Sequence, residues 1–131
     1  MQQRAFYTYL FTFSALAANT SATQTQNVQA DADFDWLKGV YQADIAAAAQ
    51  TDSSRVIPLV TILILDTASG YQLSNAAIPI ECCFGTGLTP FILPAPYRFK
   101  RAGTISITLA NYSAATTYNI RLCLSGVKSY S

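Results

Sequence analysis

The sequence contains no histidine, and this absence removes the commonest general base of enzymes. Catalytic pairs in which a histidine activates a serine or a cysteine are excluded with it. Charge is also scarce, because 11% of the residues are charged, whereas typical soluble domains have roughly 25%. The chain thus lacks most of the groups that carry out acid–base chemistry, and we expect no enzymatic activity.

The charges that are present nearly cancel, with eight Lys plus Arg against seven Asp plus Glu. Nucleic-acid binding needs a basic stripe that neutralises phosphates, and the balance argues against it. The small basic cluster of Arg98, Lys100 and Arg101 is better explained as a solvated loop or as a pairing site for acidic residues. No apolar run approaches the roughly 18–20 residues of a membrane-spanning helix, so we expect no membrane insertion.

Cysteine is also rare, and the three residues Cys82, Cys83 and Cys123 do not form a disulfide framework. We expect reduced thiols that act as small apolar residues. A bridge from Cys82 or Cys83 to Cys123 stays open if their strands are neighbours. Without histidine or a spaced cysteine pair a zinc site is not expected, and we predict no cofactor.

Short apolar strands separated by turn residues dominate the second half of the chain. Residues 104–109 and 118–125 alternate apolar with polar side chains, which is typical of strands with one buried face. Residues 56–65 are nearly all apolar, so this strand is expected to be covered on both faces. The sequence predicts one all-β domain over 1–131, an antiparallel β-sandwich that is jelly-roll-like. Residues 55–128 would form its main core.

Residues 1–30 are predicted to be an N-terminal strand or arm followed by a polar connection. Arg4 before the apolar stretch 5–16 resembles a secretory signal, but the stretch alternates, which favours a strand over 4–14. The polar residues 17–27 are expected to be a connection, and 28–32 a short strand.

The secondary structure of the middle of the chain, residues 33–97, is predicted less clearly. Residues 33–45 fit both a helix and a strand, and the β-rich surroundings with Gly39 favour the strand. Residues 46–54 read as a loop, and 76–84 as a strand broken by Pro79. Between 88 and 97, three prolines alternate with apolar residues, which predicts an extended arm or rim loop because proline cannot donate ladder hydrogen bonds.

Three aspartates, Asp31, Asp33 and Asp35, share one face if their segment is extended. They could hold calcium, but the glycine and the terminal glutamate of a calcium loop are absent. They could form a solvated edge that discourages wrong strand pairing. They could also meet the basic cluster on a neighbouring subunit.

The aromatic residues raise two further possibilities. Tyrosines near chain ends and turns suit protein contacts, because they combine contact area with a polar tip. An exposed Trp36 or a tyrosine pair could instead stack on sugars, which makes a carbohydrate-binding module an alternative. The residues that we expect to contact partners are Tyr7, Tyr9, Phe11, Phe13, Asp31, Asp33, Asp35, Phe91, Tyr97, Arg98, Lys100 and Arg101.

The order of segments resembles small virion proteins of tailed bacteriophages. The likeness lies in the aromatic opening strand, the Leu-Ala-Ala at 16–18, the Asp-Ala-Asp-Phe at 31–34, the Asp-Thr-Ala-Ser-Gly at 66–70, the Phe-Gly-Thr-Gly at 84–87, the Leu-Pro-Ala-Pro at 93–96, the strand 103–111 and the closing Leu-Ser-Gly-Val-Lys at 124–128. This resemblance implies a β-sandwich structural subunit of the virion, in particular a capsid decoration or cement protein. Its partners would be other copies of itself, as a homo-oligomer, and the major capsid protein. A neck, tail or fibre component is the alternative.

Overall fold

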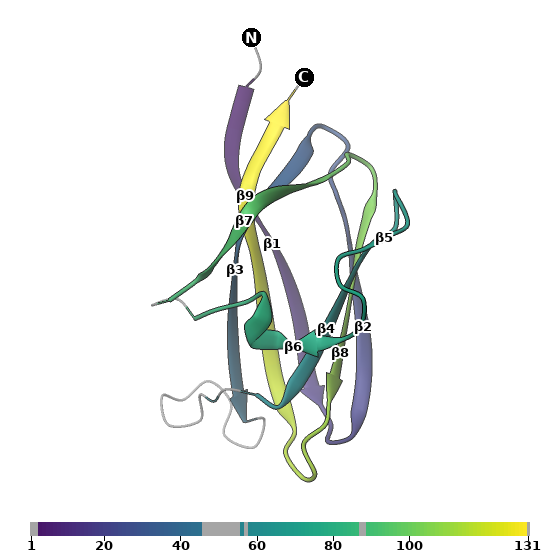
Figure 1. Ribbon diagram of the computed structural model, residues 1–131, viewed down its shortest axis with the longest axis vertical. Coiled ribbons are helices and arrows are strands. Elements are labelled where there is room, and N and C mark those ends of the chain that lie inside the picture. Colours follow the sequence, from purple (N-terminus) through teal and green to yellow (C-terminus); the bar gives the residue numbers. More distant parts are fainter. Residues whose placement is uncertain (1–2, 46–55, 57, 87–88, 131) are drawn as a thin grey trace.

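The computed structural model describes residues 3–45, 56, 58–86 and 89–130, and these form two antiparallel sheets packed face to face. Sheet A has the strand order β1-β9-β3-β7, and sheet B has the order β2-β8-β4-β5, with β6 also paired to β4. Figure 1 shows the two layers, with the start of β1 and the end of β9 at the same end of the molecule. The all-β sandwich predicted from the sequence is confirmed.

The strands of sheet A are long. They are β1 (Gln3–Leu16), β9 (Tyr118–Tyr130), β3 (Asp33–Ile45) and β7 (Phe91–Phe99). The sheet B strands are β2 (Thr20–Asn27), β8 (Thr104–Asn111), β4 (Val60–Asp66), β5 (Tyr71–Gln72) and β6 (Ile78–Pro79), and the 3-10 helix η3 (Ile80–Cys82) follows β6. The strand preferred for residues 33–45 is therefore confirmed.

Alternation along each strand places the core between the sheets. In β8 the inward residues Ile105, Ile107 and Leu109 are fully buried, and in β9 Ile120, Leu122 and Leu124 are too. Period-two alternation sends these side chains to one face, as the sequence predicted. Burial of such aliphatic side chains contributes about 1.5–3 kcal/mol each.

Several predicted segments differ from the structure. Residues 20–27 form β2 rather than a connection, because β8 supplies the hydrogen-bonding partner. Residues 28–32 form a loop between the sheets, and the strand expected over 76–84 is reduced to β6 and η3. The arm expected over 88–97 is largely the strand β7. The loop expected over 46–54 lies outside the described residues.

The apolar strand β4 is also less enclosed than expected. It begins at Val60, after Pro58, and its inward residues Val60, Ile62 and Ile64 are buried. Its outward residues Leu63 and Leu65 are only half-buried. The prediction that both faces of this strand are covered is therefore wrong.

Candidate functional site

The opening strand β1 turns its aromatic face into the chain's own core. The side chains of Tyr9, Phe11 and Phe13 are 6%, 0% and 2% exposed, and Tyr7 is half-buried beside them. The ring of Tyr9 packs edge-on against Phe34, with centroids 4.8 Å apart. The expectation that this face contacts a partner is thus wrong for the three buried residues, because the facing sheet already covers them.

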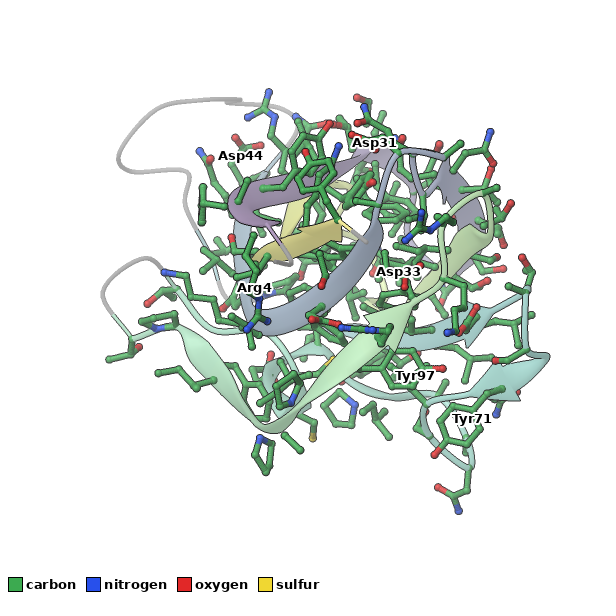
Figure 2. All side chains as sticks on the ribbon, turned by 90° about the horizontal axis from the view of Figure 1, so that it is seen from above. Arg4, Asp31, Asp33, Asp44, Tyr71 and Tyr97 are labelled. Carbon is green, nitrogen blue, oxygen red and sulfur yellow. The ribbon has the colours of Figure 1, made fainter. Side chains whose placement is uncertain are left out.

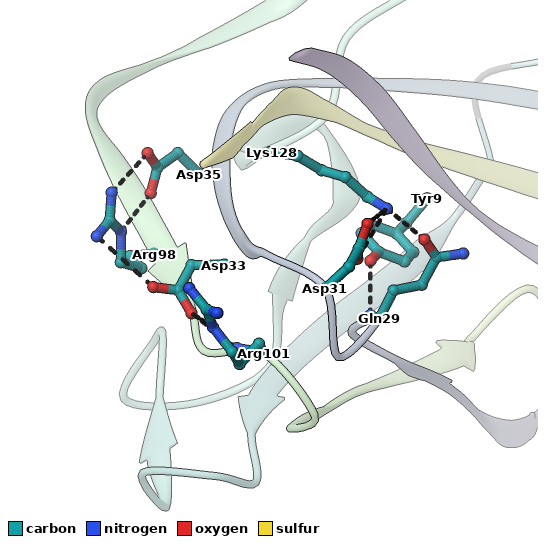
Figure 3. Close-up of polar contacts among 8 residues, drawn as sticks. All are labelled: Tyr9, Gln29, Asp31, Asp33, Asp35, Arg98, Arg101 and Lys128. Atoms are coloured by element: carbon teal, nitrogen blue, oxygen red, sulfur yellow. Dashed lines mark hydrogen bonds and ion pairs between the residues drawn. The ribbon is translucent and has the colours of Figure 1, made fainter. Parts of the chain in front are cut away.

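A buried lysine, Lys128 of β9, lies beside the first residues of β1 and contacts several of the side chains around it. The side chain of Lys128 is 4% exposed, and its Nζ donates to Gln29 Oε1 and lies 3.3 Å from Asp31 Oδ1 (Figure 3). The ammonium also lies 4.1 Å from the centre of the Tyr7 ring, a cation–π contact. Burial raises the pKa of the nearby Tyr9 hydroxyl, which accepts a hydrogen bond from the Gln29 backbone. Asp31 is thus engaged within the chain.

Asp35 forms the centre of an ion-pair cluster between β3 and β7. Its carboxylate is 7% exposed and accepts two hydrogen bonds from Arg98, of 2.8 Å and 3.0 Å, in a bidentate pair. Arg4 of β1 reaches the same carboxylate at 3.2 Å. The hydrogen bond and the charge of Asp35 raise the pKa of Arg98. Figure 3 shows the Asp35–Arg98 pair beside the Asp33–Arg101 pair.

Asp33 accepts a hydrogen bond of 2.9 Å from the Arg101 backbone, and the Arg101 side chain lies 3.3 Å away. Pairing with the basic cluster was one of the three alternatives open for the acidic edge, and Asp33 and Asp35 do pair with Arg101 and Arg98. The expectation that they meet across subunits is contradicted for Asp33, Asp35, Arg98 and Arg101, because the β3–β7 pairing places them opposite one another in one chain. Lys100 is exposed, and its predicted partner contact stays a prediction.

The acid sensitivity of the fold is expected to depend partly on Asp33. The backbone hydrogen bond from Arg101 holds the pKa of this carboxyl below its ordinary value of 3.8. A depressed folded pKa means that the stabilisation is complete above the unfolded value and is lost as pH falls through the folded pKa. Asp33→Asn should therefore be less stable than wild type at neutral pH, and the difference should shrink below about pH 4. Urea unfolding from pH 7 to pH 2 measures this; parallel stability curves for the two proteins would contradict it.

Tyr97 and Phe91 of β7 are both half-buried. The Tyr97 hydroxyl donates to Asp66 Oδ2 at 2.8 Å, and its ring stacks on Tyr71 at 5.9 Å with an interplanar angle of 11°. Figure 2 shows the pair at one side of the molecule. Because the rings cover one another, they offer a sugar less free face than an open pair would. Trp36 is 2% exposed, so the expectation that it stacks on a sugar is wrong.

The cysteines are free thiols, as expected, so the alternative of a bridge to Cys123 is contradicted. Cys83 lies at an apolar cavity of about 220 Å³ between the sheets, near Trp36 and Phe91. Burial raises the pKa of the Cys83 thiol to about 12, which keeps it protonated and unreactive at neutral pH.

The outward face of sheet A carries apolar side chains that sequence analysis did not select. Phe6 is 74% exposed, Ile92 71% and Leu10 48%. Phe6, Leu37, Pro96 and Val127 line a shallow groove of about 470 Å³ together with Arg4 and Ala5. We call Phe6, Leu10, Leu37, Ile92, Pro96 and Val127 the outer apolar face. The alternation along β1 could have predicted these positions. Once the odd-numbered residues of the strand lie in the core, the even-numbered Phe6 and Leu10 must point outward.

The outward face of sheet B has a different chemistry. Neither β2 nor β8 contains a charged residue, and their outward positions are mostly serine and threonine. Thr23 and Thr108 hydrogen-bond across the two strands at 2.8 Å. The molecule thus presents an uncharged hydroxyl-rich face on one side. On the other side, apolar side chains lie among charged ones, with Asp35 beside Val127 and Lys38 beside Ile92.

Within the described residues, no group of three or more cysteine, aspartate or glutamate side chains is arranged to hold a metal ion. Nor do they include a helix long and apolar enough to span a membrane.

Comparison with known proteins gives little further direction. No protein family and no curated protein matches this sequence. Among solved structures, a chain in the structure of the infectious bursal disease virus Gt strain aligns with this protein at 13% sequence identity and a TM-score of 0.35. The alignment covers 97% of this chain and 33% of the viral chain. A chain in the crystal structure of the infectious bursal disease virus VP2 subviral particle aligns at 10% sequence identity and a TM-score of 0.35. This alignment covers 98% of this chain and 37% of the viral chain.

The chain spans about a third of the length of these two viral chains. With TM-scores of 0.35, neither likeness establishes a shared fold or function.

Proposed function

We propose that this chain is a non-enzymatic structural subunit of a bacteriophage particle, and specifically a capsid decoration or cement protein. The observation that carries the proposal is the outer apolar face, on which Phe6 and Ile92 are more than two-thirds exposed. Large exposed apolar patches with polar rims mark protein–protein contact sites. The resemblance to small virion proteins supplies the setting, a virion in which the major capsid protein and other copies of the chain are the partners.

The charge distribution supports contact through sheet A. Arg4, Lys38, Arg98 and Arg121 lie on its strands, and Asp35 engages two of them. A partner with an apolar patch and acidic groups at its border would match this face. Burial of the exposed side chains would contribute about 25 cal/mol per Å². Many such contacts around a shell would add avidity, so each need not be strong.

Two substitutions on β7 test this role without disturbing the core. Ile92→Ser combined with Pro96→Ser removes apolar area from the outer apolar face, and both residues are exposed. We expect the number of copies bound per particle to fall at least about tenfold, which corresponds to roughly 1.4 kcal/mol. The particles should lose resistance to heat and osmotic shock in parallel.

Thr25→Ala on the hydroxyl-rich face of sheet B is the matched control, since Thr25 is also exposed on a strand. It should leave binding and particle resistance unchanged. If the β7 variant binds particles as wild type does, the outer apolar face is not the docking surface. Copy number separates the shell from the alternative neck, tail or fibre role, because a shell subunit follows the capsid lattice, whereas a neck or tail subunit follows six- or twelve-fold symmetry.

A further inference from the structure

The two sheets are open, and their edges are protected to different degrees. Sheet A ends at β1 and β7, and sheet B ends at β2 and at the short strands β5 and β6. An edge strand presents unpaired backbone groups that can pair with another chain. Natural proteins usually block such edges with proline, charge, bulges or short length.

Edge β7 is blocked in this way. It contains Pro94 and Pro96, and its pairing with β3 shifts register between Trp36 and Lys38. Proline cannot donate a ladder hydrogen bond, and the shift interrupts the row of paired residues. Another strand would therefore find few consecutive partners along β7.

Edge β1 has none of these protections over most of its length. It spans 14 residues, contains no proline or glycine, and carries one charge, Arg4, near its start. Its twelve residue pairs with β9 show one register shift, which lies between Phe13 and Leu16. Residues 4–12 thus form an uninterrupted edge.

The backbone groups that face outward can be assigned. Gln26 Nε2 donates to the carbonyl oxygen of Leu10 at 3.2 Å, so this carbonyl points away from β9. In an antiparallel strand the N–H and C=O of one residue point to the same side, and the side alternates along the chain. The open groups therefore belong to Phe6, Thr8, Leu10 and their even-numbered neighbours. The Gln26 hydrogen bond would be exchanged for a backbone hydrogen bond on pairing.

We propose that β1 pairs antiparallel with β1 of a second copy about a two-fold axis at Thr8. This register places Phe6 opposite Leu10 of the partner subunit, and the converse pair follows by symmetry. Phe6 and Leu10 are the exposed apolar residues of the strand, and each would cover the other. Arg4 would face a threonine, so no like charges oppose. The two copies of sheet A would join into one eight-stranded sheet, and their outer apolar faces would become continuous.

This dimer deepens the proposed function, since a joined pair would present the docking face twice. The dimer can be tested by placing a cysteine at Thr8, on the proposed two-fold axis. Thr8→Cys would place two sulfur-bearing residues about 5.5 Å apart at Cα, within the range that a disulfide spans. Thr12→Cys is the matched control on the same face of the same strand, because its two copies would lie about 27 Å apart.

Under mild oxidation, Thr8→Cys should give a disulfide-linked dimer well in excess of wild type, whose exposed Cys82 sets the background. Thr12→Cys should give no excess over that background. In sedimentation, wild type should dimerise with rising concentration, and Thr8→Pro should remain monomeric with an unchanged circular dichroism spectrum. The last variant removes an edge-facing N–H together with the 3.3 Å hydrogen bond between the Thr8 and Ser125 hydroxyls, and the circular dichroism spectrum checks that the fold is kept.

A wild-type protein that sediments as a monomer at all concentrations, or equal cross-linking of the two cysteine variants, would overturn the dimer. Those results would leave the β7 substitution test of particle binding intact. Absence of the chain from particles would remove the proposed function and leave the dimer standing, so the two failures are distinguishable.

Discussion

Phe11→Ala is expected to lower the free energy of unfolding by about 3–5 kcal/mol. The Phe11 side chain is 0% exposed and belongs to the core between the two sheets. Truncation removes its transfer free energy and leaves a cavity that facing strands cannot close without losing their pairing. Equilibrium unfolding in urea, with the midpoint and slope compared to wild type, measures the change.

Phe6→Ala provides the matched control, because it is the same substitution five residues earlier on the same strand. Phe6 is 74% exposed in the monomer, so the change in unfolding free energy should stay within about 0.5 kcal/mol. The comparison is made at concentrations where the protein is monomeric. Equal losses from the two substitutions, or a larger loss at Phe6, would show that β1 faces the other way.

Gly126→Ala is expected to be at least as damaging, with a loss of about 3 kcal/mol or more, at the upper end of overpacking effects. A Cβ at Gly126 would lie 1.9 Å from the carbonyl oxygen of Asp35 and 3.1 Å from Cα of Trp36. Both are backbone atoms of the neighbouring strand β3, so no side-chain rotation relieves the clash. Either β9 moves away from β3 or the central pairing of sheet A breaks. Thermal unfolding of the purified variant and its soluble yield measure the effect.

Gly70→Ala separates a clash from the general effect of removing a glycine. Gly70 has a φ of 70° and no atom within 4 Å of an added Cβ. Its substitution should cost about 1–2 kcal/mol through backbone strain alone. If Gly126→Ala were no more destabilising than Gly70→Ala, the close approach of β9 to β3 would be contradicted.

The strands that the sequence predicted well are those with a clear two-residue period. Ile105, Ile107 and Leu109 alternate with hydroxyl residues, and the structure buries them together. Strand β2 was missed because its sequence Thr-Ser-Ala-Thr-Gln-Thr-Gln-Asn has almost no apolar residue to mark a face. It exists because β8 offers a free edge, which is a property of the tertiary fold. The prolines of β7 predict an arm because proline is usually absent from central strands. In the structure β7 lies at a sheet edge, where proline is tolerated.

The candidate site was predictable in chemistry but not in location. The sequence offered pairing with the basic cluster as one of three alternatives for the aspartates at 31–35, and Asp35 does bind Arg98, whereas Asp31 binds Lys128. Whether such a pair forms within a chain or between chains depends on which strands are neighbours and in which register. Composition and periodicity do not encode that register locally. For the same reason the sequence predicted a partner contact at Phe11, which is buried, and did not identify Phe6, which is exposed.

A reconstruction of the assembled bacteriophage particle tests the central claim most directly, because it shows what covers the outer apolar face. We predict many copies of the chain arranged on the shell, with Phe6 and Ile92 buried against neighbouring protein. A particle that lacks the chain, or one in which every copy leaves both side chains in solvent, would contradict it.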